Sequence, residues 1–518
     1  TANTAAGFES LYKNTTGSNN TASGYASLQC NTIGATNTAS GACAMRLNTT
    51  GCYNTAYGYR ALQANTDGCR SVAVGYRALD ANTTGCCNTA IGMYALLCST
   101  TGTYNTATGY SALHHNSTAV SNTAVGYDSI FFNTTGNGNT AVGTRSLRSS
   151  TTGRYNAALG ANTLCSNSTG CDNTGLGSYS LRNNTTGNHN TASGYYALNK
   201  NTSACYNSAY GSLSLCANTT GSHNTAVGYA SLYTNVNAAY NTAVGYASLY
   251  GTSSGARNTA VGYAALCTNV TGACNTATGF EALRANTASF NTGSGYAALR
   301  ANTSGEKSAA VGYKSLYSST TADRNNAFGF QALCTNTTGN LNSAFGACTL
   351  HFNTTGSHNS GFGSDALYSN TTGCRNVSIG NLSMYLNTTG SFNTASGFYA
   401  LRSNTTGIIN TAIGACTLVS NTTGNNNTAV GFNALVTNTT AGNNTGIGVN
   451  ALCKNTTGAN NTSMGFQSLF SNTTGGNNYA SGVNALCANT SGAANTASGY
   501  AALKANTTGS NNTASGYK

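Results

Sequence analysis

The chain of 518 residues contains no proline and no tryptophan, and charged residues make up only 6% of it. Disordered chains are usually rich in proline and charge and poor in aromatic residues, whereas this chain holds 31 tyrosines and 15 phenylalanines. The composition therefore predicts an ordered chain. It also fits no ordinary set of globular domains, although the length alone would suggest roughly three or four.

Long apolar runs and dense basic runs are both missing. No stretch approaches about 18 apolar residues, so we expect no membrane insertion. The formal charge of +12 is spread thinly, and no run of Lys or Arg interleaves with aromatic residues, so we expect no nucleic acid partner. No apolar leader precedes Thr1, and both ends fall inside a repeat. We therefore expect either a segment of a longer fibre or chains that stack end to end.

What the sequence has instead is a repeat. The stretch NTAVGYASL occurs at residues 224–232 and again at 241–249, and the motif N-T-A-x-G recurs every 17 residues from Asn3 to Asn512. One step, between Asn275 and Asn291, is 16 residues long. Numbered from 0 at that asparagine, the consensus coil is N-T-A-(V/S/I)-G-(Y/F)-x-(A/S)-L-x-x-N-T-(T/S)-G-x-x.

A period of 17 is too short for a helical hairpin, and glycine and asparagine recur too often for helices. The sequence predicts an all-β fold, a parallel β-solenoid (β-roll) of about 30 coils that forms one continuous array over residues 1–518. Each coil should hold a strand around N-T-A-V-G-Y, a second short strand near A-L, and a turn at N-T-T-G whose glycine takes a positive φ. The single deletion falls in that turn, which should absorb it without shifting the strands.

Identical stacked coils let like residues form ladders, in which each Asn hydrogen-bonds the Asn above and below it. The expected ladder and core residues include Asn224, Asn241, Asn258, Leu232, Leu249 and Leu266.

The ionisable residues keep to a few positions of the coil. All 21 Lys and Arg and all nine Asp and Glu lie at positions 6, 9, 10, 15 or 16, except Asp67 at position 13, so we expect these positions to face water. Alternate strand residues face opposite ways, which places positions 0, 2 and 4 on one side and 1, 3 and 5 on the other. Both sides exclude charge. We expect one side to line the interior together with the Leu of position 8.

The other side is then a stripe of Thr, Val and Tyr, far larger than a soluble monomer usually exposes. We expect copies of the same chain to cover it in a parallel trimer or other lateral bundle. Two alternatives remain open: a wider coil that folds both sides into its own core, or a stripe left bare to bind ice, carbohydrate or a mineral surface.

Catalytic patterns are missing as well. No Ser/His/Asp arrangement, carboxylate pair or phosphate-binding loop stands out, and the six His residues occupy the same positions as the charges. Neither C-x-x-C nor a Cys/His cluster at zinc spacing occurs. We therefore expect no enzyme activity, no cofactor and no metal.

The 19 cysteines lie at the variable positions too and are expected on the surface. Cys52, Cys69 and Cys86 share position 15 on successive coils, where neighbouring Cα atoms would be about 5 Å apart, within reach of a disulfide. One of the three would stay unpaired. The alternative is drift at unconstrained positions.

The N-T-T-G turn also matches the N-glycosylation pattern. On an exposed turn the candidate acceptors are Asn14, Asn48, Asn133, Asn184, Asn353, Asn370, Asn387, Asn404 and Asn455. The alternative is that these asparagines serve only the backbone of the turn.

The repeat N-T-A-V-G-Y-x-A-L-x-x-N-T-T-G resembles the repetitive shafts of phage and bacterial tail-fibre proteins. It is also similar to the head repeats of trimeric autotransporter adhesins, in which an S-V-A-I-G-like stretch recurs once per coil of a left-handed parallel β-roll. The resemblance implies a trimeric fibre at a cell or virion surface, extracellular, with an adhesive or spacer role and a cell-surface or glycan receptor. The coil here is longer than the adhesin coil, and 19 cysteines are unusual for either family.

These observations predict a non-enzymatic structural fibre or filament shaft. The competing expectation is a β-solenoid that binds ice, carbohydrate or another surface through a regular Thr/Tyr face, because Thr recurs at positions 1, 12 and 13.

Overall fold

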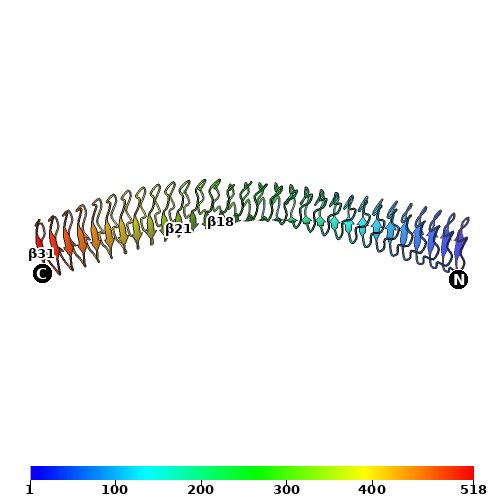
Figure 1. The fold of residues 1–518 in the computed structure, drawn as a ribbon, viewed down its shortest axis with the longest axis horizontal. Helices are drawn as coiled ribbons and strands as arrows, with labels where there is room; N and C mark the ends of the chain where they lie inside the picture. Colours follow the sequence, from blue (N-terminus) through cyan, green and yellow to red (C-terminus); the bar gives the residue numbers. More distant parts are fainter. Residues whose placement is uncertain (1) are drawn as a thin grey trace. The chain divides into compact units, whose positions relative to one another are not determined.

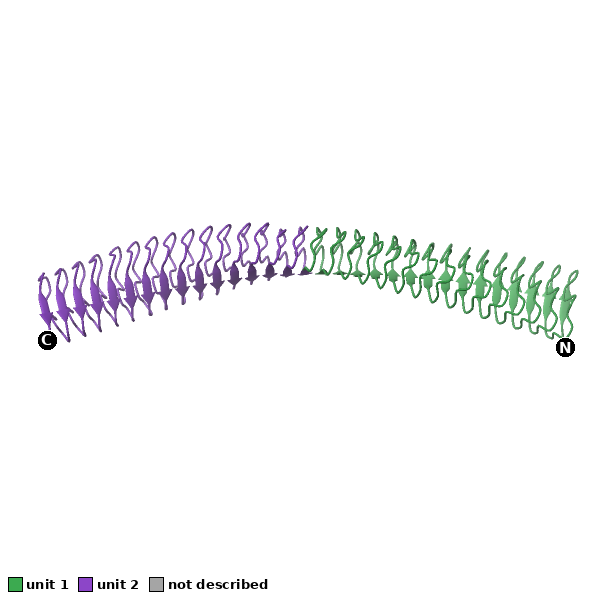
Figure 2. Ribbon diagram, viewed as in Figure 1, with its two compact units in different colours: residues 1–258 green, residues 259–518 purple. Residues whose placement is uncertain are grey.

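The computed structural model describes residues 2–518, which divide into two compact units, unit 1 ending at Asn258 and unit 2 beginning at Thr259 (Figure 2). The described residues form three-residue strands joined by turns, and no helix is among them. Each unit is a parallel β-solenoid with one strand per 17-residue coil. The predicted fold class is therefore confirmed in each unit taken by itself.

The strands of unit 1 are β1 (Thr4–Ala6), β2 (Thr21–Ser23), β3 (Thr38–Ser40), β4 (Thr55–Tyr57), β5 (Val72–Val74), β6 (Thr89–Ile91), β7 (Thr106–Thr108), β8 (Thr123–Val125), β9 (Thr140–Val142), β10 (Ala157–Leu159), β11 (Thr174–Leu176), β12 (Thr191–Ser193), β13 (Ser208–Tyr210), β14 (Thr225–Val227) and β15 (Thr242–Val244). The strands of unit 2 are β16 (Thr259–Val261), β17 (Thr276–Thr278), β18 (Thr292–Ser294), β19 (Ala309–Val311), β20 (Asn326–Phe328), β21 (Ser343–Phe345), β22 (Ser360–Phe362), β23 (Val377–Ile379), β24 (Thr394–Ser396), β25 (Thr411–Ile413), β26 (Thr428–Val430), β27 (Thr445–Ile447), β28 (Thr462–Met464), β29 (Tyr479–Ser481), β30 (Thr496–Ser498) and β31 (Thr513–Ser515).

Within each unit every strand pairs in parallel with the strand of the next coil, and like residues face one another. Thr225 pairs with Thr242, and Ala226 with Ala243, one repeat further along the chain. Figure 1 shows the strands as a row of short arrows. The equal spacing of like residues in sequence thus becomes a ladder of like residues in space.

The coil contains one strand, at positions 1–3, and the predicted second strand near A-L is wrong. The residues at positions 6 and 8 take left-handed backbone conformations instead, as in Ala230 (φ 53°) and Leu232 (φ 51°). Their backbone groups still bond between coils, because the Leu232 N–H donates to the Ser248 carbonyl oxygen at 3.0 Å and the Thr234 N–H donates to the Tyr250 carbonyl oxygen at 3.1 Å. This segment is therefore a folded turn that stacks on its neighbours without being extended.

The glycine that needs a positive φ is the one at position 4. Gly228 has φ 124°, and a Cβ there would lie 2.5 Å from the carbonyl oxygen of Gly245 in the next coil. The glycine of N-T-T-G was predicted to take this role, but Gly221 has no positive φ. Position 4 therefore requires glycine on two grounds, the backbone conformation and the close approach of the next coil.

The interior is narrow and is filled by the side chains of five positions. Asn of position 0, Ala of position 2, Ala or Ser of position 7, Leu of position 8 and Asn of position 11 are buried in almost every coil. The side chains predicted for the core and ladder are all fully buried, namely Asn224, Asn241, Asn258, Leu232, Leu249 and Leu266.

The predicted asparagine ladders are present at two positions of the coil. At position 0, the Asn241 N–H donates to the Oδ1 of Asn224 at 2.9 Å. At position 11, the Nδ2 of Asn48 donates to the Oδ1 of Asn31 at 2.7 Å and to the carbonyl oxygen of Gly51 at 3.0 Å. The Gly51 carbonyl also accepts from the Nδ2 of Asn37 at 2.8 Å. One carbonyl therefore joins the two asparagines of a coil across its interior.

The coil with the deletion keeps the strand register. Thr276 pairs with Thr292, which lies 16 residues further along the chain. In the turn, the Asn286 Nδ2 donates to the carbonyl oxygen of Ala288, two residues ahead, at 2.8 Å. In a full coil the same bond spans three residues, as from Asn302 to Gly305. The turn absorbs the missing residue, as predicted.

Candidate functional site

The outward side of the strand is a surface of the coil that carries no charged side chain. We call positions 1, 3 and 5 the uncharged face. Position 3 and position 5 side chains are exposed, as in Val311 (37%), Phe328 (37%) and Phe330 (51%). A wider coil that encloses both sides of the strand is therefore wrong, because only the Ala side points inward.

Aromatic rings stack along the uncharged face from coil to coil. At position 3 of unit 2, Phe345 lies between Phe328 and Phe362 with ring centroids 4.9 and 5.1 Å apart and nearly parallel planes. At position 5, the ring centroid of Tyr313 is 5.2 Å from that of Tyr296, and Tyr313 also stacks on the ring of Phe330 in the next coil. The spacing of the coils sets these distances, which lie in the favourable range for offset stacking. The face is therefore ordered as well as apolar.

Threonine hydroxyls divide into two groups. At position 12 the hydroxyl donates to the backbone of the next coil, as from Thr185 to the Thr202 carbonyl oxygen at 3.0 Å and from Thr202 to that of Thr219 at 3.1 Å. These hydroxyls serve the stacking of the coils. At position 1, Thr225 and Thr242 are half-exposed on the uncharged face in strict register.

Most charged side chains lie outside the core, as predicted, but two acids do not. Asp80 and Asp128 are buried, 5% and 6% exposed. Asp80 accepts from Arg77 at 2.8 Å and forms an ion pair with Arg60 at 3.3 Å. The side chain of Asp is short, so the longer side chains of Arg77 in the same coil and Arg60 in the preceding coil cover Asp80 and compensate its charge.

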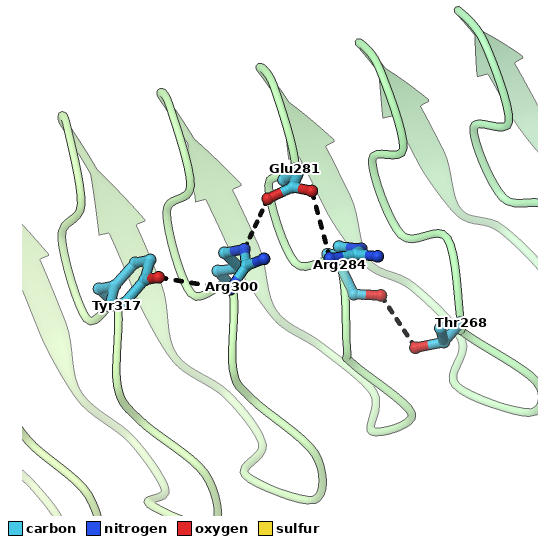
Figure 3. A network of polar contacts seen from close by, with 5 residues as sticks. All are labelled: Thr268, Glu281, Arg284, Arg300 and Tyr317. Carbon is cyan, nitrogen blue, oxygen red and sulfur yellow. Dashed lines mark hydrogen bonds and ion pairs between the residues drawn. The ribbon is translucent and has the colours of Figure 1, made fainter.

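Longer charge networks connect successive coils in unit 2 (Figure 3). Glu281 contacts Arg284 at 3.2 Å and Arg300 at 2.6 Å, and Arg300 donates to the Tyr317 hydroxyl at 3.3 Å. The Thr268 hydroxyl donates to the carbonyl oxygen of Arg284 at 2.9 Å. The arginines are about one third or more exposed, so this network adds little stability and forms a polar surface apart from the uncharged face.

The cysteines of position 15 act as hydrogen-bond acceptors. The N–H of Cys52 donates to the Sγ of Cys69 at 3.2 Å, and the N–H of Cys69 donates to the Sγ of Cys86 at 3.1 Å. Ser and Asn at this position accept in the same way, as Ser222 does from Cys205 at 3.1 Å. All three thiols of the candidate column are free, and their disulfide pairing stays a prediction. Because Ala35, Val120 and Ile408 also occupy position 15, the alternative of drift at an unconstrained position stays open.

Two other cysteines correct the expected surface placement. Cys216 and Cys334, both at position 9, are buried, 7% and 9% exposed. Burial raises the pKa of the Cys216 thiol, and nearby Lys200 opposes this weakly. Position 9 therefore lies at the margin of the core, where the narrow Cys side chain is covered and long basic side chains extend past it.

The nine candidate glycosylation sites were expected on an exposed turn. This prediction is wrong for eight of them, which are buried, whereas Asn14 is half-buried. The Asn370 side chain is fully buried, and its Nδ2 donates to the Oδ1 of Asn353 at 2.7 Å and to the Gly373 carbonyl oxygen at 3.0 Å. The buried acceptors are Asn48, Asn133, Asn184, Asn353, Asn370, Asn387, Asn404 and Asn455. Attachment of a glycan to Nδ2 would disrupt these bonds, so the asparagines fit their role in the turn.

One group of metal-ligating side chains is brought together that the sequence analysis missed. Cys98, His114 and His115 lie with their ligand atoms all within 4.8 Å of one another. Cys98 and His115 are one repeat apart, so the coil period itself places them side by side. A search for ligands that are close in sequence could not detect this spacing, whereas a search at the repeat period would have found it.

No protein-family model matches the chain, and no curated protein matches it. None of the described residues belongs to a helix with the length and hydropathy needed to cross a bilayer. The β-solenoid implied by the resemblance is present, whereas membership of the tail-fibre or adhesin families stays a prediction.

Proposed function

We propose that the chain is a structural fibre shaft that associates laterally with copies of itself through the uncharged face. The observation that supports this is that the side chains at positions 3 and 5 are exposed or half-exposed and carry no charge in any described coil. Exposed apolar area of this extent is a usual mark of an interface. Ordered aromatic and β-branched ladders also suit packing against an identical ladder.

A spacer or adhesive role follows from the same organisation. The repetition of similar coils provides length and many equivalent contacts. The setting at a cell or virion surface, and a glycan or cell-surface receptor, rest on the resemblance of the repeat alone.

The test compares charges placed on and beside the uncharged face. Phe432 and Ile447 belong to it, 51% and 41% exposed, whereas neighbouring Asn433 lies at position 6, where charge is common. A double variant, Phe432→Lys with Ile447→Lys, should dissociate the assembly, because burying unpaired charge costs several kcal/mol, on the order of 3–5. Asn433→Lys should leave it intact.

Sedimentation velocity under reducing conditions measures the mass of each variant against the single-chain mass of 52.3 kDa. Circular dichroism checks that the strands remain. A wild-type chain that stays single at all concentrations, or a double variant whose mass equals that of wild type, would overturn the proposal.

One observation supports a second function, which is ice binding. The half-exposed Thr residues of position 1 stand in strict register, as Thr225 and Thr242 do, and a flat regular array of hydroxyls is what ice binding needs. The hydroxyls of position 12 do not contribute, because they donate to the backbone. Thermal hysteresis of the purified chain decides between the two functions, and its absence removes the ice-binding alternative.

A further inference from the structure

We propose that Cys98, His114 and His115 form a binding site for a divalent metal ion of borderline softness, of which Zn²⁺ is the representative. One thiol and two imidazoles are the donor set that this class prefers. Cys98 and His115 occupy position 10 of successive coils, and His114 lies next to them at position 9. This site is independent of the uncharged face.

The backbone of the coils fixes the relative placement of the ligands. The Cys98 N–H donates to the carbonyl oxygen of His114 at 2.9 Å, and the His115 N–H donates to the carbonyl oxygen of Phe131 at 3.0 Å. The ligand atoms lie within 4.8 Å of one another. In a tetrahedral zinc site the ligand atoms are about 3.3–3.8 Å apart, given Zn–S near 2.3 Å and Zn–N near 2.0 Å. Closing the site therefore takes about 1 Å of side-chain movement.

The two imidazoles are held by an aromatic wall from the next coil. Phe131 stacks on His114 with centroids 4.8 Å apart, and Phe132 stacks on His115 at 5.6 Å. The guanidinium of Arg148 covers both phenylalanines from the following coil. The rings of the ligands are thus oriented before any ion binds, which reduces the entropy that binding must overcome.

A buried ring nitrogen lacks a partner at this place. The Nδ1 of His114 is inaccessible to solvent and makes no hydrogen bond. An unsatisfied buried polar atom is costly, and a metal ion bound by this nitrogen itself would give it a partner. This observation is independent of the spacing of the three ligands.

Zinc binding uses the thiolate of Cys98 and the neutral imidazoles of His114 and His115. Binding would release the thiol proton to water, as it does whenever a thiol becomes a zinc ligand. Three protein ligands leave the fourth coordination position to water.

Co²⁺ titration of the metal-free full chain tests the proposal, with a phosphine reductant present to keep the thiols free. We expect one Co²⁺ per chain with the visible absorption of a tetrahedral site and a thiolate-to-cobalt charge-transfer band, both removed by one equivalent of Zn²⁺. Cys98→Ser should abolish the charge-transfer band, and His115→Asn should weaken Co²⁺ binding by at least about tenfold.

The matched control uses another Cys and His one repeat apart. Cys334 and His351 share position 9 on successive coils but lack a third ligand, so Cys334→Ser should leave the titration unchanged. Because the ligand positions vary among coils, circular dichroism of the metal-free variants should match wild type. The proposal is overturned if wild type shows no tetrahedral cobalt spectrum, or if Cys98→Ser retains the band.

Discussion

Ser99 lies one coil after Asn82, and these two buried side chains do not satisfy each other: the Asn82 Oδ1 and the Ser99 Oγ both lack a hydrogen-bond partner. Both belong to position 11, where an asparagine of the later coil would donate to the Oδ1 of the earlier one. The same break occurs wherever Ser or Thr replaces Asn at this position. The unpaired neighbours are Asn133 with Ser150, Asn235 with Thr252, and Asn302 with Ser319.

Ser99→Asn should repair this break and stabilise the adjoining coils. The new Nδ2 would reach the Asn82 Oδ1, and removing a buried unpaired acceptor is worth about 1–2 kcal/mol. Because coils of a solenoid open locally, amide hydrogen exchange over residues 82–102 is the measurement, and protection should rise. Asn65→Ser is the matched control and should lower protection in its own coil. Unchanged or weaker protection in Ser99→Asn would contradict the assignment of the ladder.

Gly312→Ala should destabilise unit 2 strongly. Gly312 has φ 129°, and a Cβ there would lie 2.4 Å from the carbonyl oxygen of Gly329. Conformational strain alone costs about 1–3 kcal/mol, and the steric conflict adds to it. A Cβ on Gly305 would also lie close to backbone, 2.2 Å from the Ala322 carbonyl oxygen, but Gly305 needs no positive φ and Ala322 itself occupies the same position in the next coil, so Gly305→Ala should cost less.

Denaturant titration followed by circular dichroism measures this difference. Equal losses of stability in Gly312→Ala and Gly305→Ala would show that the backbone conformation at position 4 does not distinguish the two glycines.

Folded chains produced in a glycosylating secretory host should carry no glycan on Asn370. A glycan on its Nδ2 would disrupt the bonds to Asn353 and Gly373 in a coil that has no room for the sugar. Mass spectrometry of the soluble fraction, before and after glycosidase treatment, is the measurement. Asn14, whose side chain is half-buried, is the internal comparison and should be modified first. Full occupancy at Asn370 in well-folded material would count against the inward placement of the side chain.

Cys216 should react slowly with alkylating reagents in the folded chain. Burial raises the pKa of its thiol, so less thiolate forms at a given pH than in the unfolded chain. A raised folded-state pKa also means that the neutral thiol adds stability below the ordinary thiol pKa and that this contribution is lost as pH rises through the folded value. Alkylation rates measured by mass spectrometry over alkaline pH should therefore rise at a higher pH in the folded chain than for an ordinary thiol. In denaturant the dependence of the rate on pH should return to that of an ordinary thiol. Identical profiles in the two conditions would contradict the burial of Cys216.

The repeat made much of the fold predictable. Because the same residues recur one period apart, the parallel pairing of Thr225 with Thr242 and the burial of Leu232 both follow from the spacing and the exclusion of charge. The asparagine ladder follows too, since identical polar residues that stack inside a solenoid must satisfy one another.

Backbone conformation was harder to predict. Leu232 has a left-handed φ, and nothing in a leucine signals this, because its cost is offset by hydrogen bonds to the next coil. The N-T-T-G motif has the composition of an exposed turn. Its asparagine side chain is nevertheless buried, and it donates to the carbonyl oxygen of the glycine in the same motif. The Cys98, His114 and His115 cluster was missed because its members are neighbours only across coils.

The asparagine ladder at position 11 has a direction. Asn48 donates to Asn31 and Asn65 donates to Asn48, and wherever two asparagines of this row are bonded the later one is the donor. Along the row the amide donors thus point toward earlier coils and the oxygen acceptors toward later ones. A coil stacked in the reverse sense would set donor against donor, so the amide groups alone give the array of coils a chemically defined polarity.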